Sequence, residues 1–107
     1  QDFSAIAESL GKGDVVSLST HFDSNPELTI LENEAIYSKS QIETILKNFF
    51  SKNKPLAYDA IHYGNSGNGA FFQIGKLSTS TAIFRTYLYA KNINGQFLIQ
   101  EFRIEDN

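Results

Sequence analysis

The clearest pattern in the chain is a pair of alternating apolar and polar runs on either side of Asn94-Gly95. The ribbon that contains them, Thr81–Glu105, reads TAIFRTYLYAKNINGQFLIQEFRIE. Asn-Gly between two such runs is a strong signal for a tight β-hairpin. A two-residue loop pairs Tyr87 with Phe102 and a four-residue loop pairs it with Gln100, and both registers give the strands the same two faces.

Neither face of this ribbon is purely polar, so neither is typical of an ordinary wet surface. Three short helices in a chain of this size cannot cover both faces of a sheet. We therefore expect the second face to be buried in a twofold homodimer. The apolar residues of that face are Phe84, Leu88, Phe97 and Ile99. The alternative is a strand bulge, which would shift the alternation and leave this face more polar.

Two short amphipathic helices are predicted at the start of the chain. The first opens at Asp2-Phe3-Ser4 and ends at Gly11 and Gly13, because glycine is common just after a helix. Asp14 is a plausible N-cap for the second helix, and Asn25-Pro26 interrupts the pattern. The apolar stripes of the two helices are Phe3, Ile6, Ala7 and Leu10, and then Val15, Leu18 and Phe22.

The strongest helical pattern covers Gln41–Phe50. Ser38 with Gln41, or Ser40 with Glu43, fits a capping box, and Asn53-Lys54-Pro55 stops the helix. Its apolar stripe is broad and needs a partner sheet. The stripe consists of Ile42, Ile45, Leu46, Phe49 and Phe50.

The remaining segments alternate with the period of strands. They are Leu28–Ile30 and Ala35–Tyr37 around a turn at Asn33-Glu34, then Leu56–Tyr63, a loop over Gly64–Gly69, and Ala70–Leu77. Gly75, inside a strand pattern, indicates a bulge or bend. The order α-α-β-β-α-β-β-β-β predicts an α+β fold, a single domain over residues 1–107 in which a curved antiparallel sheet wraps around the Gln41–Phe50 helix.

Composition narrows the functional classes. The net charge is −3 and the basic residues are scattered. The chain therefore lacks the basic stripe that a nucleic-acid-binding surface needs, and we expect no nucleic-acid partner. The chain has no cysteine, which excludes disulfides and thiolate chemistry. No apolar run approaches the roughly 20 residues of a membrane span. There is also no methionine, and the chain begins at Gln1. Removal of a signal peptide would explain this start, and so would artificial trimming of the chain. Of the two, we expect an exported, periplasmic or secreted protein whose signal peptide has been removed.

Three stretches give the sequence a family resemblance: YSKSQIETILKNFF, HYGNSGNGAFFQIGKLSTSTAIFRTY and LIQEFRIE. Together they resemble an uncharacterised family of small exported domains from Bacteroidetes. That family lies within the nuclear-transport-factor-like and ketosteroid-isomerase-like (cystatin-like) superfamily. The resemblance covers nearly the whole chain and implies a cone-shaped fold and export. It implies no activity, although relatives of the fold commonly dimerise through the sheet.

Catalytic chemistry finds little support in the alternation of the strands. Ketosteroid-isomerase chemistry needs a carboxylate base facing a hydroxyl donor in an apolar pocket. Asp59 and Tyr58 are neighbours in one strand and therefore point to opposite faces. Glu101 is expected on the face opposite Tyr87, so neither pair is expected to converge. Asp59 and His62 are likewise expected on opposite faces, so we predict no metal site and no cofactor.

Ligand binding is the other possibility. Arg85 in mid-strand could hold a small acidic ligand that Tyr87 and Gln100 orient, with His62 and Tyr58 as further candidates at the pocket. Alternatively, Arg85 forms an internal charge pair with Glu32, Glu43 or Glu105. We thus expect a non-catalytic exported domain that dimerises and binds a small ligand or protein partner. The alternative is a small enzyme of the ketosteroid-isomerase or dehydratase type, using a pocket between the Gln41–Phe50 helix and the sheet.

Overall fold

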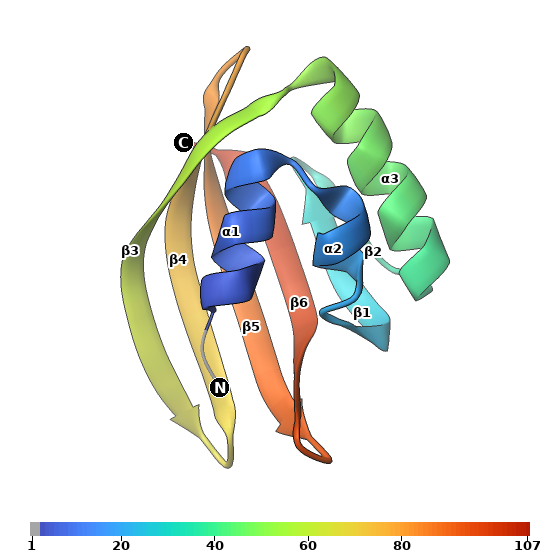
Figure 1. The fold of residues 1–107 in the computed structure, drawn as a ribbon, viewed down its shortest axis with the longest axis vertical. Coiled ribbons are helices and arrows are strands. Elements are labelled where there is room, and N and C mark those ends of the chain that lie inside the picture. The colour runs from blue at the N-terminus through green and yellow to red at the C-terminus, as the bar shows by residue number, and fades with distance from the viewer. Residues whose placement is uncertain (1–2) are drawn as a thin grey trace.

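Three helices lie on one face of a six-stranded sheet and leave the other face open (Figure 1). A computed structural model describes residues 3–107. Gln1 and Asp2, including the predicted start of the first helix at Asp2, lie outside the described residues. The elements are α1 (Ser4–Lys12), α2 (Val15–Ser19), β1 (Phe22–Ile30), β2 (Asn33–Ile36), α3 (Lys39–Lys52), β3 (Pro55–Gly67), β4 (Ala70–Thr79), β5 (Ile83–Ile93) and β6 (Gln96–Asp106). This order confirms the α+β prediction.

The strands are arranged in the order β2-β1-β6-β5-β4-β3. All neighbours are antiparallel except β1 and β6, which run parallel, so the sheet is mixed rather than purely antiparallel as expected. No hairpin joins β1 to β6, and alternation along two strands carries no information about their relative direction. The long connection through α3 takes the chain from one edge of the sheet to the other (Figure 1).

Helix α3 begins with one of the two predicted capping boxes. The Ser38 hydroxyl accepts from the Gln41 amide at 3.3 Å, and the Gln41 side chain accepts from the Ser38 amide at 2.9 Å. These bonds satisfy two backbone donors that a helix start otherwise leaves free. At the other end, Asn53 follows the last helical residue, and its side chain donates to the Phe49 carbonyl oxygen at 3.0 Å.

The core lies between the three helices and the sheet. Ile42 and Leu46 of α3 have no exposed surface, and Phe50 is 7% exposed. They pack in one cluster with residues of α1, α2 and the central strands, including Ile6, Leu10, Leu18, Phe22, Leu28, Leu77, Leu88, Phe102 and Ile104. The expected burial of the α3 stripe is therefore confirmed for these three residues.

The hairpin at Asn94-Gly95 has the predicted two-residue loop, because Ile93 pairs with Gln96. A bulge then inserts one extra residue, Gln100, between the pairs Ala90–Ile99 and Tyr89–Glu101. Beyond the bulge, Tyr87 pairs with Arg103 and not with Phe102 or Gln100 as either predicted register required. A bulge of this kind exchanges the faces of all later residues of its strand.

This bulge overturns the expected dimer surface. Leu88 and Ile99 are fully buried, Phe84 is 6% exposed, and Phe97 is half-buried against the ring of Phe3. All four face the helices. The bulge also brings Phe102 and Ile104 to this same side of the sheet, so the apolar residues of both strands lie in the core. The alternative, a bulge that leaves the open face more polar, is the arrangement found. We call this open face, which carries Arg85, Tyr87 and Tyr89 of β5, the outer face.

Several element boundaries differ from the prediction, most of them by one or two residues, and three differences matter for the site. Phe22 begins β1 and does not extend α2. Asn33 and Glu34 belong to β2. The turn lies at Leu31 and Glu32, immediately before them, and Leu31 has a φ of 58°. Strand β3 continues to Gly67, so the glycine-rich loop shrinks to Asn68-Gly69, both with positive φ.

Candidate functional site

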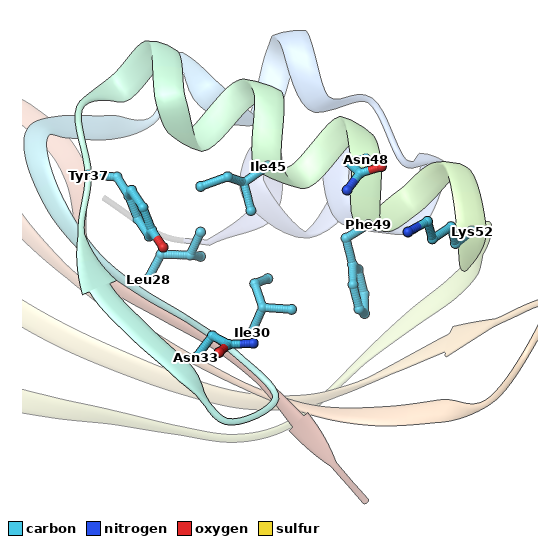
Figure 2. A pocket seen from close by; sticks show the side chains of 8 residues that line it. All are labelled: Leu28, Ile30, Asn33, Tyr37, Ile45, Asn48, Phe49 and Lys52. Carbon is cyan, nitrogen blue, oxygen red and sulfur yellow. The ribbon is translucent and has the colours of Figure 1, made fainter.

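An open groove lies between α3 and the β1–β2 hairpin (Figure 2). Its volume is about 310 Å³, at the lower end of the range for small-ligand sites. We call it the α3 groove, and its lining residues are Leu28, Ile30, Asn33, Tyr37, Ile45, Asn48, Phe49 and Lys52.

The apolar wall of the groove comes from the width of the α3 stripe. Ile42, Leu46 and Phe50 use one side of that stripe for the core. Ile45 and Phe49, four residues apart and therefore on one flank of the helix, are only half-buried. Their side chains point toward the sheet in Figure 2, where Leu28 and Ile30 of β1 form the opposite wall. The helix thus carries more apolar surface than the core covers.

The rim of the groove is polar and includes a single charge. Asn33 and Tyr37 come from the hairpin side, and Asn48 and Lys52 from α3. In Figure 2 the amine of Lys52 is directed toward the Phe49 end of the groove. None of the ion pairs among residues 3–107 involves Lys52. Its ammonium is therefore available to a ligand.

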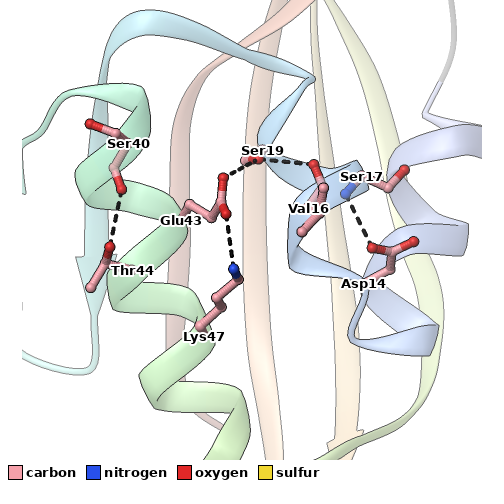
Figure 3. A network of polar contacts seen from close by, with 8 residues as sticks. All are labelled: Asp14, Val16, Ser17, Ser19, Ser40, Glu43, Thr44 and Lys47. Atoms are coloured by element: carbon pink, nitrogen blue, oxygen red, sulfur yellow. Dashed lines mark hydrogen bonds and ion pairs between the residues drawn. The ribbon is translucent and has the colours of Figure 1, made fainter.

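The other flank of α3 is occupied by contacts with α2 (Figure 3). The Ser19 hydroxyl donates to Glu43 at 3.3 Å, and Lys47 forms an ion pair with the same carboxylate at 3.0 Å. The hydrogen bond and charge of Lys47 lower the pKa of Glu43. This flank fixes the helix, while the groove flank is left open.

Tyr58 lies in a buried polar cluster on the helix side of the sheet, outside the groove. Its hydroxyl donates to the Gln73 side chain at 2.8 Å, and burial raises the pKa of the phenol. Gly75 makes room for this ring, because a Cβ there would lie 2.5 Å from the Tyr58 oxygen. The nearby Thr86 opposes this rise in the pKa of Tyr58, although the buried Thr86 hydroxyl has no hydrogen-bond partner among the described residues.

Arg85, Tyr87 and His62 lie on the outer face. Tyr87 stacks on Phe72 with ring centroids 6.3 Å apart, and the Arg103 guanidinium lies 5.5 Å from the Tyr87 ring centre. Arg103 also forms an ion pair with Glu101. Arg85 is exposed and forms no ion pair with any described carboxylate, including the expected partners Glu32, Glu43 and Glu105.

His62 and Asp59 share the outer face, contrary to the expected alternation. Asp59 pairs with Lys76 and His62 with Ile74, because a bulge falls between Ala60 and His62. Even so, residues 3–107 contain no cluster of three or more metal-binding side chains.

Gln100 sits at the bulge of β6 and binds its own chain. Its amide donates to Asp23 at 3.0 Å and to the Leu98 carbonyl oxygen at 3.2 Å. The hydrogen bond from Gln100 is the largest cause of the lowered pKa of Asp23. The five candidates from the sequence therefore occupy three separate places and do not form one site.

The sequence indicated the place of the groove but not its residues. A pocket between the Gln41–Phe50 helix and the sheet was expected for the enzymatic alternative. The signal for its residues was the five-membered stripe of α3, which is wider than a single helix–sheet contact needs. No sequence pattern marks the rim residues Asn33, Tyr37 and Lys52. They come together only because the β1–β2 hairpin packs against α3.

The lining of the groove does not match ketosteroid-isomerase chemistry. It contains no carboxylate and no imidazole, which a ketosteroid-isomerase-type base would require.

No helix within residues 3–107 has the length and apolar character to cross a bilayer.

Comparisons with known proteins agree with this fold. A solved structure of a DUF4783 family protein from Bacteroides ovatus is 24% identical, with a TM-score of 0.91, and the match covers 97% of this chain and 94% of that one. One from Bacteroides fragilis is also 24% identical, with a TM-score of 0.90 and 96% of each chain covered. A ketosteroid isomerase-like protein from Erwinia carotovora atroseptica is 10% identical, with a TM-score of 0.80 over 95% of this chain and 88% of that one. At these identities the likeness concerns the fold alone.

No curated protein matches the sequence. The family model for the domain of unknown function DUF4783 matches residues 3–105. The chain therefore belongs to the DUF4783 family, which has a nuclear-transport-factor-like fold.

Proposed function

We propose that this domain is a non-catalytic binding module and that its ligand occupies the α3 groove. The observation that carries the proposal is the half-buried state of Ile45 and Phe49 beside an open hollow of about 310 Å³. Apolar side chains of this size gain about 1.5–3 kcal/mol each when fully buried. A ligand with an apolar body completes that burial without changing the fold.

The polar rim supports binding of a small amphipathic molecule. A ligand site is typically apolar with a few polar groups that fix orientation. Asn33, Tyr37 and Asn48 supply amide and hydroxyl groups around the opening. The groove volume of about 310 Å³ suits a small molecule; it is about ten times the roughly 30 Å³ that one water molecule occupies in the liquid.

Octanol, a neutral molecule of about this size, is a suitable probe. Titration into the ¹⁵N-labelled domain is expected to give saturable chemical-shift changes at Ile30, Ile45 and Phe49. Ile45→Thr should weaken binding about fivefold, since it removes buried apolar surface. Leu56→Thr is the matched control, because Leu56 is exposed on β3 and lies outside the groove. Shifts that do not saturate, or equal weakening by both variants, would refute the proposal.

A second proposed property is self-association through the outer face. The charges of this face are divided between its two halves. One half, on β2, β1 and β6, carries Glu27, Glu34, Glu101 and Glu105 with Arg103. The other half, on β5, β4 and β3, carries Arg85, Lys76 and Lys91 with Asp59.

A twofold axis through the middle of this face would set the acidic half of one copy against the basic half of the other. The half-buried aromatic pair Phe72 and Tyr87 lies near the centre of such a contact. The carboxyl groups of the acidic half lie close together: a hydrogen bond from protonated Glu27 to Glu34, partial desolvation and the nearby charge of Glu101 raise the pKa of Glu27. A basic partner surface would relieve this repulsion.

Charge reversal tests this self-association by analytical ultracentrifugation. The double variants Glu27→Lys/Glu34→Lys and Lys76→Glu/Arg85→Glu should each be monomeric, while an equimolar mixture of the two forms a heterodimer. A wild-type chain that stays monomeric at all accessible concentrations would contradict the proposal, as would a mixture that remains monomeric.

A further inference from the structure

We infer that the ligand of the α3 groove carries one carboxylate, which binds Lys52, at one end of an apolar body. This inference rests on the proposed function and names the chemical class of its ligand. Three observations support it: the charges around the groove, the ion pair of the neighbouring Lys47 and the number of donors at the groove.

The lining of the groove is cationic in a protein that is acidic overall. The chain has a net charge of −3, yet Lys52 is the only charged residue among the eight that line the groove. The nearest acidic positions of the β1–β2 hairpin do not compensate it. Glu34 lies on the outer face, where it contacts Glu27, and Glu32 is exposed in the turn. An anionic group is thus complementary to this end of the groove.

Lys52 differs from Lys47, which lies on the same helix. Lys47 is held by Glu43 on the flank that faces α2 (Figure 3). Lys52 has no carboxylate partner within residues 3–107, and its amine is directed toward the Phe49 end of the groove (Figure 2). Lys47 is thus held by a carboxylate of its own helix, whereas the ammonium of Lys52 has no such partner at the groove.

The number of cationic groups indicates a single negative charge on the ligand. Phosphate sites usually combine several donors, such as an arginine fork or a row of backbone amides at a helix N-terminus. The α3 groove provides one ammonium at the C-terminal end of its helix, together with the side chains of Asn33 and Asn48. That set of donors suits a carboxylate, with the apolar body lying along Ile45 and Ile30, which are both half-buried.

The ligand pair octanoate and octanol separates this inference from the proposed function. Both have an apolar chain of the same length, and only octanoate carries a charge. By titration calorimetry at low salt, octanoate should bind wild-type protein about fivefold more tightly than octanol, which is the upper range for one partly exposed ion pair. Added salt should weaken the binding of octanoate and leave that of octanol unchanged.

Substitutions at Lys52 identify the group responsible. Lys52→Gln should abolish the preference for octanoate and leave octanol binding intact, and Lys52→Arg should retain the preference. Lys54→Gln is the control, because Lys54 is exposed close by but does not line the groove. Thermal unfolding of each variant verifies that it is folded.

Three results would overturn the inference. If octanol binds as tightly as octanoate, the ligand needs no negative charge, although the proposed function stands. If octanoate causes chemical-shift changes at Arg85 and Tyr87 instead of Phe49, the carboxylate site lies on the outer face. If neither compound binds, both the inference and the proposed function fail.

Discussion

The two sides of the apolar stripe of α3 differ in burial although they belong to one helix and one run of sequence. Ile42, Leu46 and Phe50 are buried in the core, whereas Ile45 and Phe49 are half-buried beside an open hollow. All five are apolar and all five fit the same helical pattern. The difference shows that the core uses only part of the stripe. The unused part is the surface on which we propose that the domain binds its ligand.

The largest expected effect is on the core side of this comparison. Leu46→Ala removes a fully buried side chain, and should lower the free energy of unfolding by about 2–5 kcal/mol because it leaves a cavity. Urea denaturation measures this loss. A loss below about 1 kcal/mol would mean that Leu46 does not support the core.

A smaller loss of stability is expected on the groove side. The ring of Phe49 packs against Phe84 and Phe50, at centroid distances of 5.4 and 5.8 Å, but is only partly buried. Phe49→Ala should therefore cost roughly 1–2 kcal/mol, about half of the value for a buried phenylalanine. It should also abolish octanol binding. If its cost equals that of Leu46→Ala, the two sides of the stripe are equivalent and the comparison is wrong.

The smallest effect concerns the flank that contacts α2, and it depends on pH. Lys47 lowers the pKa of Glu43 below its ordinary value of 4.5. This stabilisation is present above pH 4.5 and is lost as the pH falls through the lower pKa of the folded state. Lys47→Gln should move the pKa of Glu43 up toward 4.5, as followed by NMR titration of its carboxyl carbon. An unchanged pKa would show that the ion pair does not form in solution. Lys52→Gln is the control and should leave this pKa unchanged.

Much of the fold could be predicted because its signals are local. The capping box at Ser38, the stop after Lys52 and the two-residue loop at Asn94-Gly95 each depend on a few neighbouring residues. The family resemblance supplied the overall arrangement. Export is a further prediction from the sequence, and it stays a prediction.

The faces of the sheet could not be predicted, because one inserted residue decides them. Gln100 has no property that marks it as a bulge residue. In the structure its side chain donates a hydrogen bond to Asp23, which is distant in sequence. The regular alternation assumed for β6 therefore placed Phe102 and Ile104 on the wrong side. It also assigned Phe84 and Leu88 to a dimer surface, whereas they belong to the core.

The groove was only partly predictable for a related reason. The apolar residues of α3 were visible in the pattern, but the number of them that the core would cover depends on where β1 and β2 lie. Arg85 and Gln100 are candidates because they stand among apolar residues of the ribbon, and Tyr58 is one because its hydroxyl can donate. In the structure each has its own local explanation: an exposed face for Arg85, a bulge for Gln100 and a buried hydrogen bond for Tyr58.

The most direct measurement is a set of intermolecular nuclear Overhauser effects between octanoate and the labelled domain. If the α3 groove is the binding site, the protons of the ligand chain will show contacts with the side chains of Ile45 and Phe49. They will show none with Tyr87 on the outer face. Contacts with Tyr87 in place of Phe49, or none with any side chain at saturating ligand, would contradict the account.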